Sequence, residues 1–137
     1  MTAITLDTNV LTRYLTKDDL FQAEAATQLI ENNECEVLPS VLLELVWVLS
    51  SKGTYHLTRT QVLERIRHLF TIPTIYINHP EIIVTTLGWY EAGMDFADAL
   101  HLANSKHGFA TFDRHLVNKA KEMNAPQTII FLGQASH

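Results

Sequence analysis

Short runs of apolar and β-branched residues alternate along the chain with longer segments in which apolar residues recur every three or four positions. The short runs predict buried strands and the longer segments predict helices, an alternation typical of a parallel sheet in an α/β protein. The expected strands are Ala3–Leu6, Glu36–Leu38, Thr74–Ile77, Phe109–Thr111 and Thr128–Phe131, and the expected helices are Val10–Leu15, Leu20–Asn32, Val41–Ser51, Arg59–Phe70, Glu81–Ala92, Ala97–His107 and Arg114–Asn124.

Composition narrows the class of protein. Apolar residues make up 47% of the 137 residues and charged residues 18%, so we expect one globular domain over residues 1–137. No apolar run approaches the roughly 20 residues of a membrane helix, and no signal segment is visible. The single Cys35 cannot form an internal disulfide, which fits a reducing compartment. These features predict a cytoplasmic protein that does not enter a membrane.

The net charge of −5 argues against a broad basic face for nucleic acid. It does not exclude a nuclease whose own acidic residues are neutralised by bound cations. The acidic side chains therefore carry most of the information about function.

The first of these acids is Asp7, in the stretch ITLDTNVL. Asp7, Thr8 and Asn9 follow the first strand and precede the first helix, and all three residue types are common at helix N-termini. Capping alone explains Asp7 unless other carboxylates reach the same place.

Glu44 is the second, and its surroundings are apolar. From Val41 to Leu49 it is the one charged residue, and a helix that is apolar on all sides is expected to be buried on all sides. A buried, unpaired carboxylate costs several kcal/mol in order-of-magnitude terms. We therefore favour a functional role over a solvent-exposed strip near the helix start, where the helix dipole would also favour an acid.

Two further acidic motifs lie in the second half of the chain. In GMDFADALHLA, Asp95 and Asp98 have the spacing of a helix-capping pair, so capping explains them at little cost. In GFATFDRH, Asp113 follows a strand and would by itself be the N-cap of the next helix.

Sheet topology turns these single acids into a candidate site. In a parallel α/β sheet every strand ends at the same edge, and the connecting helices start there. Asp7 and Asp113 end strands, whereas Glu44 and Asp98 lie in the first turns of helices, so we expect the four carboxylates to converge at that edge. Clustered carboxylates repel one another without a cation, and oxygen ligands without Cys or His favour Mg²⁺ or Mn²⁺.

Other chemistries lack their motifs. The seven His residues show no zinc-ligand spacing, no serine lies in a nucleophile elbow, and neither glycine-rich phosphate-binding motif is present.

The order of acids in LDTN, LLELVWVL, DFADALHLA and TFDRH resembles the PIN-domain ribonucleases, most closely the VapC-like toxins of bacterial type II toxin–antitoxin systems. The resemblance runs from about Ile4 to Phe131. It implies a three-layer α/β/α fold with a central five-stranded parallel sheet in the order 3-2-1-4-5. It also implies a catalytic acidic quartet, formed by Asp7, Glu44, Asp98 and Asp113. Within this quartet, the metal ligands would be Asp7, Asp98 and Asp113. The residues expected to line the pocket are Thr8, Asn9, Asp95 and Thr111.

The same resemblance implies Mg²⁺-dependent (or Mn²⁺-dependent) endonucleolytic cleavage of RNA and a cognate antitoxin that inhibits it. The apolar surplus of the sequence and the resemblance together predict a homodimer. The basic residues to test first for contacts with the RNA backbone are Arg13, Lys17, Lys52, Arg59 and Arg114.

Two other functions stay open from the sequence. One is a PIN-fold regulatory subunit that binds DNA through its antitoxin partner. The other is an aspartate phosphoacceptor signalling domain, which also gathers acids at strand ends. Such a domain would want a lysine at the end of the last strand, where this chain has TIIFLGQ.

Overall fold

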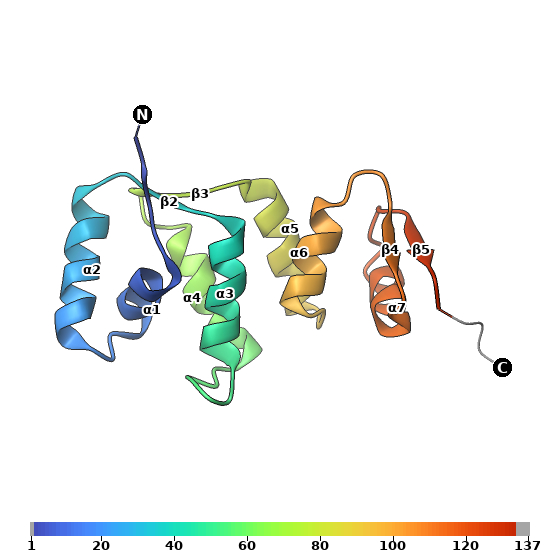
Figure 1. Ribbon diagram of the computed structural model, residues 1–137, viewed down its shortest axis with the longest axis horizontal. Coiled ribbons are helices and arrows are strands. Elements are labelled where there is room, and N and C mark those ends of the chain that lie inside the picture. Colours follow the sequence, from blue (N-terminus) through green and yellow to red (C-terminus); the bar gives the residue numbers. More distant parts are fainter. Residues whose placement is uncertain (1, 134–137) are drawn as a thin grey trace. The chain divides into compact units, whose positions relative to one another are not determined.

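The computed structural model describes residues 2–133, and the chain divides into two compact units, Met1–Pro80 (unit 1) and Glu81–His137 (unit 2). Figure 1 shows the order of elements along the chain. Within the described residues the chain forms seven helices and five strands. Each unit is described by itself.

Unit 1 is a three-stranded parallel sheet with four helices. The sheet has the order β1-β2-β3, with Ile4 opposite Cys35 and Cys35 opposite Ile75. The elements are β1 (Ile4–Thr5), α1 (Thr8–Thr16), α2 (Leu20–Asn32), β2 (Cys35–Val37), α3 (Pro39–Ser50), α4 (Arg59–Leu69) and β3 (Ile75–Ile77).

The core of unit 1 is aliphatic. Its largest fully buried side chains come from every helix, from the sheet and from the residue after β1: Leu6, Leu11, Ile30, Val37, Leu42, Leu45, Leu49, Ile66 and Leu69. In α3 and α4 these side chains recur every three or four residues and form the apolar stripe that packs on the core. Cys35 lies in the central strand and is 0% exposed, and burial is the main reason that its thiol pKa is raised.

Unit 2 pairs two parallel strands and adds helices. Its strands are joined in register, with Phe109 opposite Ile129 and Thr111 opposite Phe131. Met94, Ala99, Leu102 and Ala120 form its buried centre. The elements are α5 (Pro80–Glu91, which begins at the last residue of unit 1), α6 (Phe96–Asn104), β4 (Phe109–Thr111), α7 (Arg114–Glu122) and β5 (Ile129–Phe131).

All five expected strands and all seven expected helices are confirmed, with ends shifted by up to three residues. The first helix begins at Thr8 rather than Val10 because the Asp7 side chain already caps it there. The third begins at Pro39, whose fixed φ suits the first turn of a helix. The strand pairs that the order 3-2-1-4-5 requires within each unit are present, and their union in one five-stranded sheet stays a prediction.

One expectation for α3 is wrong. The helix is buried on one side only, through Leu42, Leu45, Val46 and Leu49, whereas Glu44 is exposed and Trp47 is 66% exposed. An apolar sequence does not bury a helix on all sides when only one of its faces meets the rest of the unit. Among the described helices, none combines the length and apolar character that a membrane span requires.

Candidate active site

Asp7 is the N-cap of α1. Its Oδ1 accepts hydrogen bonds from the backbone N–H groups of Asn9, at 2.8 Å, and Val10, at 3.3 Å. Both bonds fall on one oxygen, the residue is exposed, and Oδ2 accepts no hydrogen bond from residues 2–133. The local interpretation of Asp7 is therefore confirmed, and it leaves one carboxylate oxygen available for another ligand.

A groove of about 490 Å³ starts at Asp7 and runs between α1 and α2. We call it the α1–α2 groove; Asn9 and Arg13 line it, together with the exposed ring of Phe21. Thr8 does not line this groove, and its carbonyl accepts a hydrogen bond from the Thr12 hydroxyl at 2.8 Å.

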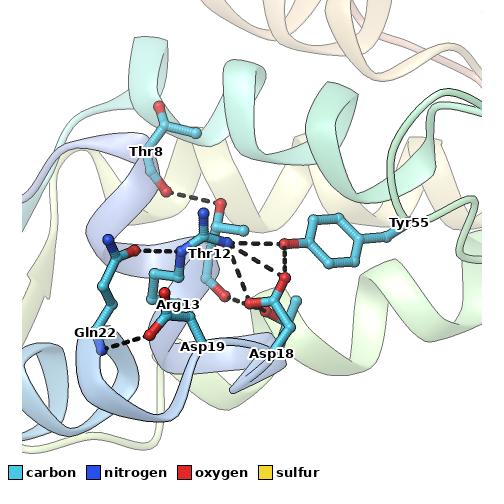
Figure 2. Close-up of polar contacts among 8 residues, drawn as sticks. Thr8, Thr12, Arg13, Asp18, Asp19, Gln22 and Tyr55 are labelled. Atoms are coloured by element: carbon cyan, nitrogen blue, oxygen red, sulfur yellow. Dashed lines mark hydrogen bonds and ion pairs between the residues drawn. The ribbon is translucent and has the colours of Figure 1, made fainter.

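Arg13 is tied into a polar network that the sequence did not reveal (Figure 2). Its Nε donates to Gln22 at 2.6 Å, and its Nη1 donates to Asp18 at 3.1 Å and to the Tyr55 hydroxyl at 3.0 Å. These bonds join α1 to the start of α2 and to the segment between α3 and α4. Arg13 is thus occupied by protein acceptors, which weakens its candidacy as an RNA contact.

Asp18 lies at the centre of this network. It accepts from the Tyr55 hydroxyl at 2.6 Å and from the Thr16 hydroxyl at 3.0 Å. The Tyr55 hydrogen bond is the main reason that the pKa of Asp18 is lowered; Thr16 and Arg13 act in the same direction, and burial opposes them. The carboxylate therefore stays charged and fixes the turn between α1 and α2.

Glu44 projects from the second turn of α3 and is exposed. Within residues 2–133 its carboxylate makes no hydrogen bond and no ion pair. The argument that burial forces a partner on Glu44 is therefore wrong, because the side chain is solvated. An exposed, unengaged carboxylate is nevertheless able to bind a cation or a water molecule.

In unit 2, Asp95 and Asp113 are both helix N-caps. Asp95 caps α6 through a bond from the Asp98 backbone N–H to its Oδ2, at 3.1 Å. Asp113 caps α7 through bonds from His115 and Leu116 to its Oδ1, at 2.9 and 3.2 Å. The Thr111 hydroxyl accepts from the Asp113 backbone N–H at 3.0 Å and so fixes the turn that follows β4.

Asp98 differs from these capping acids. It is partly buried, and burial is the main reason that its carboxyl pKa is raised. The charges of Asp95 and Asp113 raise it further, whereas His101 and His115 act in the opposite direction. The three acids, which we call the unit 2 acid cluster, are therefore within electrostatic reach of one another. The two histidines were not foreseen, although their positions three residues after Asp98 and two after Asp113 are visible in the sequence.

The donor chemistry of the cluster fits a hard divalent cation, because carboxylate oxygens are the preferred ligands of Mg²⁺ and Mn²⁺. Burial is the main cause of the raised Asp98 pKa, and repulsion by Asp95 and Asp113 adds to it; a cation would relieve that repulsion. Within residues 2–133, no group of three or more His, Cys, Asp or Glu side chains is arranged to hold a metal ion. Two of the three expected metal ligands, Asp98 and Asp113, are in unit 2, and Asp7 is in unit 1.

Residues 4–123 match the PIN domain family, so the chain belongs to that family. The match includes Asp7 and Glu44 from unit 1 and the whole acid cluster of unit 2. PIN domains are typically nucleases that act on RNA and generally use divalent metal ions. No curated protein matches the chain significantly. Family membership favours a nuclease over a phosphoacceptor signalling domain.

Proposed function

We propose that the protein is a metal-dependent endoribonuclease that hydrolyses RNA phosphodiester bonds. The observation that carries this proposal is the unit 2 acid cluster, in which the partly buried Asp98 lies within electrostatic reach of Asp95 and Asp113 and has its pKa raised, chiefly by burial and further by those two charges. The cluster lies within the part of the chain that matches the PIN domain family. A structural role does not call for such an arrangement, because Asp95 and Asp113 complete the helix caps without Asp98's carboxylate.

Asp7, Asp98 and Asp113 would hold one or two Mg²⁺ or Mn²⁺ ions as a single site of a single PIN domain. Such an ion binds a phosphate oxygen and lowers the pKa of a bound water molecule. The capping bonds of Asp7 and Asp113 fix each carboxylate at a helix start, where one oxygen stays available. Glu44 would complete the outer shell of the metal or orient the attacking water, and Thr8, Asn9, Asp95 and Thr111 would line the pocket.

We further propose that the protein is a cytoplasmic toxin, active as a homodimer and inhibited by a small antitoxin. Leu20 and Phe21 on α2 and Phe112 after β4 are each at least 75% exposed, as expected for side chains that a partner covers. The antitoxin would lay a helix on such apolar surface and place a basic side chain among the acids. Expression alone should then arrest growth, and co-expression of the antitoxin should relieve the arrest.

The ribonuclease activity is tested with purified protein, structured RNA, and Mg²⁺ or Mn²⁺. We expect cleavage that a chelator abolishes and that Asp7→Asn reduces by about a hundredfold or more, since even residues that only support a metal ligand cost ten- to hundredfold. Asn caps helices as well as Asp, so the variant should fold normally.

Asp19→Asn is the matched control. Asp19 is an exposed N-cap of α2 in the same unit, accepting from Gln22 at 3.0 Å, and the proposed site does not use it. Cleavage by Asp19→Asn should equal that of the wild type. Equal cleavage by wild type and Asp7→Asn would sink the proposal.

A further inference from the structure

A second pocket of unit 1 has more cationic than anionic side chains in its lining, Lys17 and Arg65 against Glu64, although the chain is acidic overall. It lies between the end of α1 and the C-terminal half of α4, has a volume of about 220 Å³, and is lined by Tyr14, Leu15, Lys17, Glu64, Arg65 and His68. We call it the α1–α4 pocket. Five of the ten Lys and Arg residues of the chain belong to α4 or to α1 and its C-cap, namely Arg13, Lys17, Arg59, Arg65 and Arg67.

The two cationic side chains that line this pocket, Lys17 and Arg65, make few polar contacts with the rest of the described residues. The Arg65 guanidinium makes one long hydrogen bond, from Nη1 to the Gln61 carbonyl at 3.4 Å, and its buried Nε has no hydrogen-bond partner in residues 2–133. Lys17 rests its Nζ 4.9 Å above the Tyr14 ring and has no carboxylate partner among the described residues. Arg13, by contrast, has three protein acceptors.

Flat rings stand beside these cations. The rings of Tyr14 and His68 are nearly parallel, with 13° between their planes and 6.2 Å between their centres, and His68 is exposed. Cations next to an exposed ring are what single-stranded nucleic acid needs, since phosphates contact the charges and bases stack on the rings. At 220 Å³ the pocket is below the range typical of small-molecule sites, so it suits a segment of a strand better than a free metabolite.

We propose that the α1–α4 pocket binds a phosphate of the RNA substrate through Lys17 and Arg65, with the neighbouring base against His68; this inference rests on the proposed ribonuclease function. Asp7 and Lys17 cap opposite ends of α1 and are separated by about 15 Å along the helix axis, by the rise per residue. The pocket therefore holds a nucleotide away from the cleaved bond and determines where the strand is cut rather than the chemistry of the cut.

The test is binding of a fluorescent single-stranded RNA to the full-length protein in EDTA, measured by anisotropy at several salt concentrations. We compare Lys17→Asn, Lys17→Arg, Arg65→Gln and His68→Ala with the wild type. Asn is chosen because Lys17 has a left-handed backbone, with φ 55°, which Asn tolerates well. Lys106→Asn, at an exposed lysine of unit 2, is the control for loss of one positive charge. Thermal melting confirms that each variant is folded.

We expect Lys17→Asn and Arg65→Gln to weaken binding several-fold and to reduce the slope of log K against log salt by about 0.7 each, one phosphate contact on a single strand. His68→Ala should weaken binding roughly fivefold without changing the slope, since stacking is not ionic. Lys17→Arg and Lys106→Asn should bind like the wild type. If Arg65→Gln does not fold, Lys17→Asn and Lys17→Arg decide the question alone.

Three results would overturn the inference. Equal weakening by Lys17→Asn and Lys106→Asn would mean that binding is diffuse. RNA binding at the wild-type level by all pocket variants, with cleavage intact in the wild type, would refute the pocket and leave the proposed function standing. A wild type that neither binds nor cleaves RNA would refute the proposed function, and the inference with it.

Discussion

Asp7 in unit 1 and Asp98 in unit 2 both lie at the start of a helix, but their carboxylates are held in opposite ways. The Asp7 carboxylate is exposed and accepts two backbone N–H groups, which stabilises α1. The Asp98 carboxylate is partly buried near two other acids, and its backbone N–H, not its side chain, takes part in the cap of α6. Capping explains the position of Asp7 locally and leaves one of its oxygens available, whereas no local hydrogen bond within residues 2–133 explains the carboxylate of Asp98.

The largest effect should come from adding metal. Mn²⁺ at a hundredfold excess over its dissociation constant should stabilise the wild type by about 2.7 kcal/mol, because binding to the folded state alone shifts the unfolding equilibrium. The gain should shrink or vanish in Asp98→Asn and persist in Asp19→Asn. Thermal unfolding at two Mn²⁺ concentrations measures it. If Mn²⁺ does not change the melting temperature of the wild type, then Asp7, Asp98 and Asp113 do not bind a common ion.

An intermediate effect should separate capping acids from Asp98 in the metal-free protein. Asp7→Ala and Asp113→Ala should each lower the free energy of unfolding by about 1 kcal/mol, since each removes the acceptor of two backbone N–H groups. Asp7→Asn and Asp113→Asn should restore most of that loss. Asp98→Ala should show no such loss. Urea unfolding curves in EDTA measure these differences in the free energy of unfolding. A loss for Asp98→Ala as large as that for Asp7→Ala would contradict the distinction between Asp98 and the capping acids.

The smallest effect should be a pH dependence specific to Asp98. Its pKa is raised in the folded state, chiefly by burial and then by Asp95 and Asp113, so the folded protein holds this proton more tightly than the unfolded chain. Its contribution to stability is therefore greatest below the ordinary aspartate pKa and decreases as pH rises through the raised value.

Asp98→Asn should consequently raise the melting temperature of the metal-free protein at neutral pH and leave it closer to the wild type at acid pH. Melting temperatures of both proteins across the acid range in EDTA provide the measurement. A variant less stable than the wild type at neutral pH would contradict the electrostatic account of Asp98.

The sequence predicted those parts of the molecule that depend on near neighbours. Every strand and helix within residues 2–133 was expected, because each rests on a local apolar pattern, to which several helices add a local cap. The capping roles of Asp7, Asp95 and Asp113 were foreseen for the same reason. The assignment of these acids and Glu44 to one metal site stays a prediction.

What the sequence did not reveal depends on residues far apart in the chain. The bond between Tyr55 and Asp18 joins positions 37 residues apart, and nothing in the local pattern around either residue indicates it. The exposure of Glu44 and Trp47 was missed because a run of apolar letters does not say how many faces of α3 meet the rest of unit 1. The buried Nε of Arg65 likewise has no hydrogen-bond partner among the described residues, because the fold brings no acceptor close to it, and the local sequence does not indicate this.

Because of the position of Cys35, modification of its thiol can be used to measure local unfolding of unit 1. The one thiol of the protein lies in the central strand of the unit 1 sheet and is 0% exposed, and unit 2 has no cysteine. A thiol reagent reaches it only when that strand separates from its neighbours or loses its covering helices. The rate of its alkylation therefore follows fluctuations of unit 1 alone, without an introduced label and without a signal from unit 2.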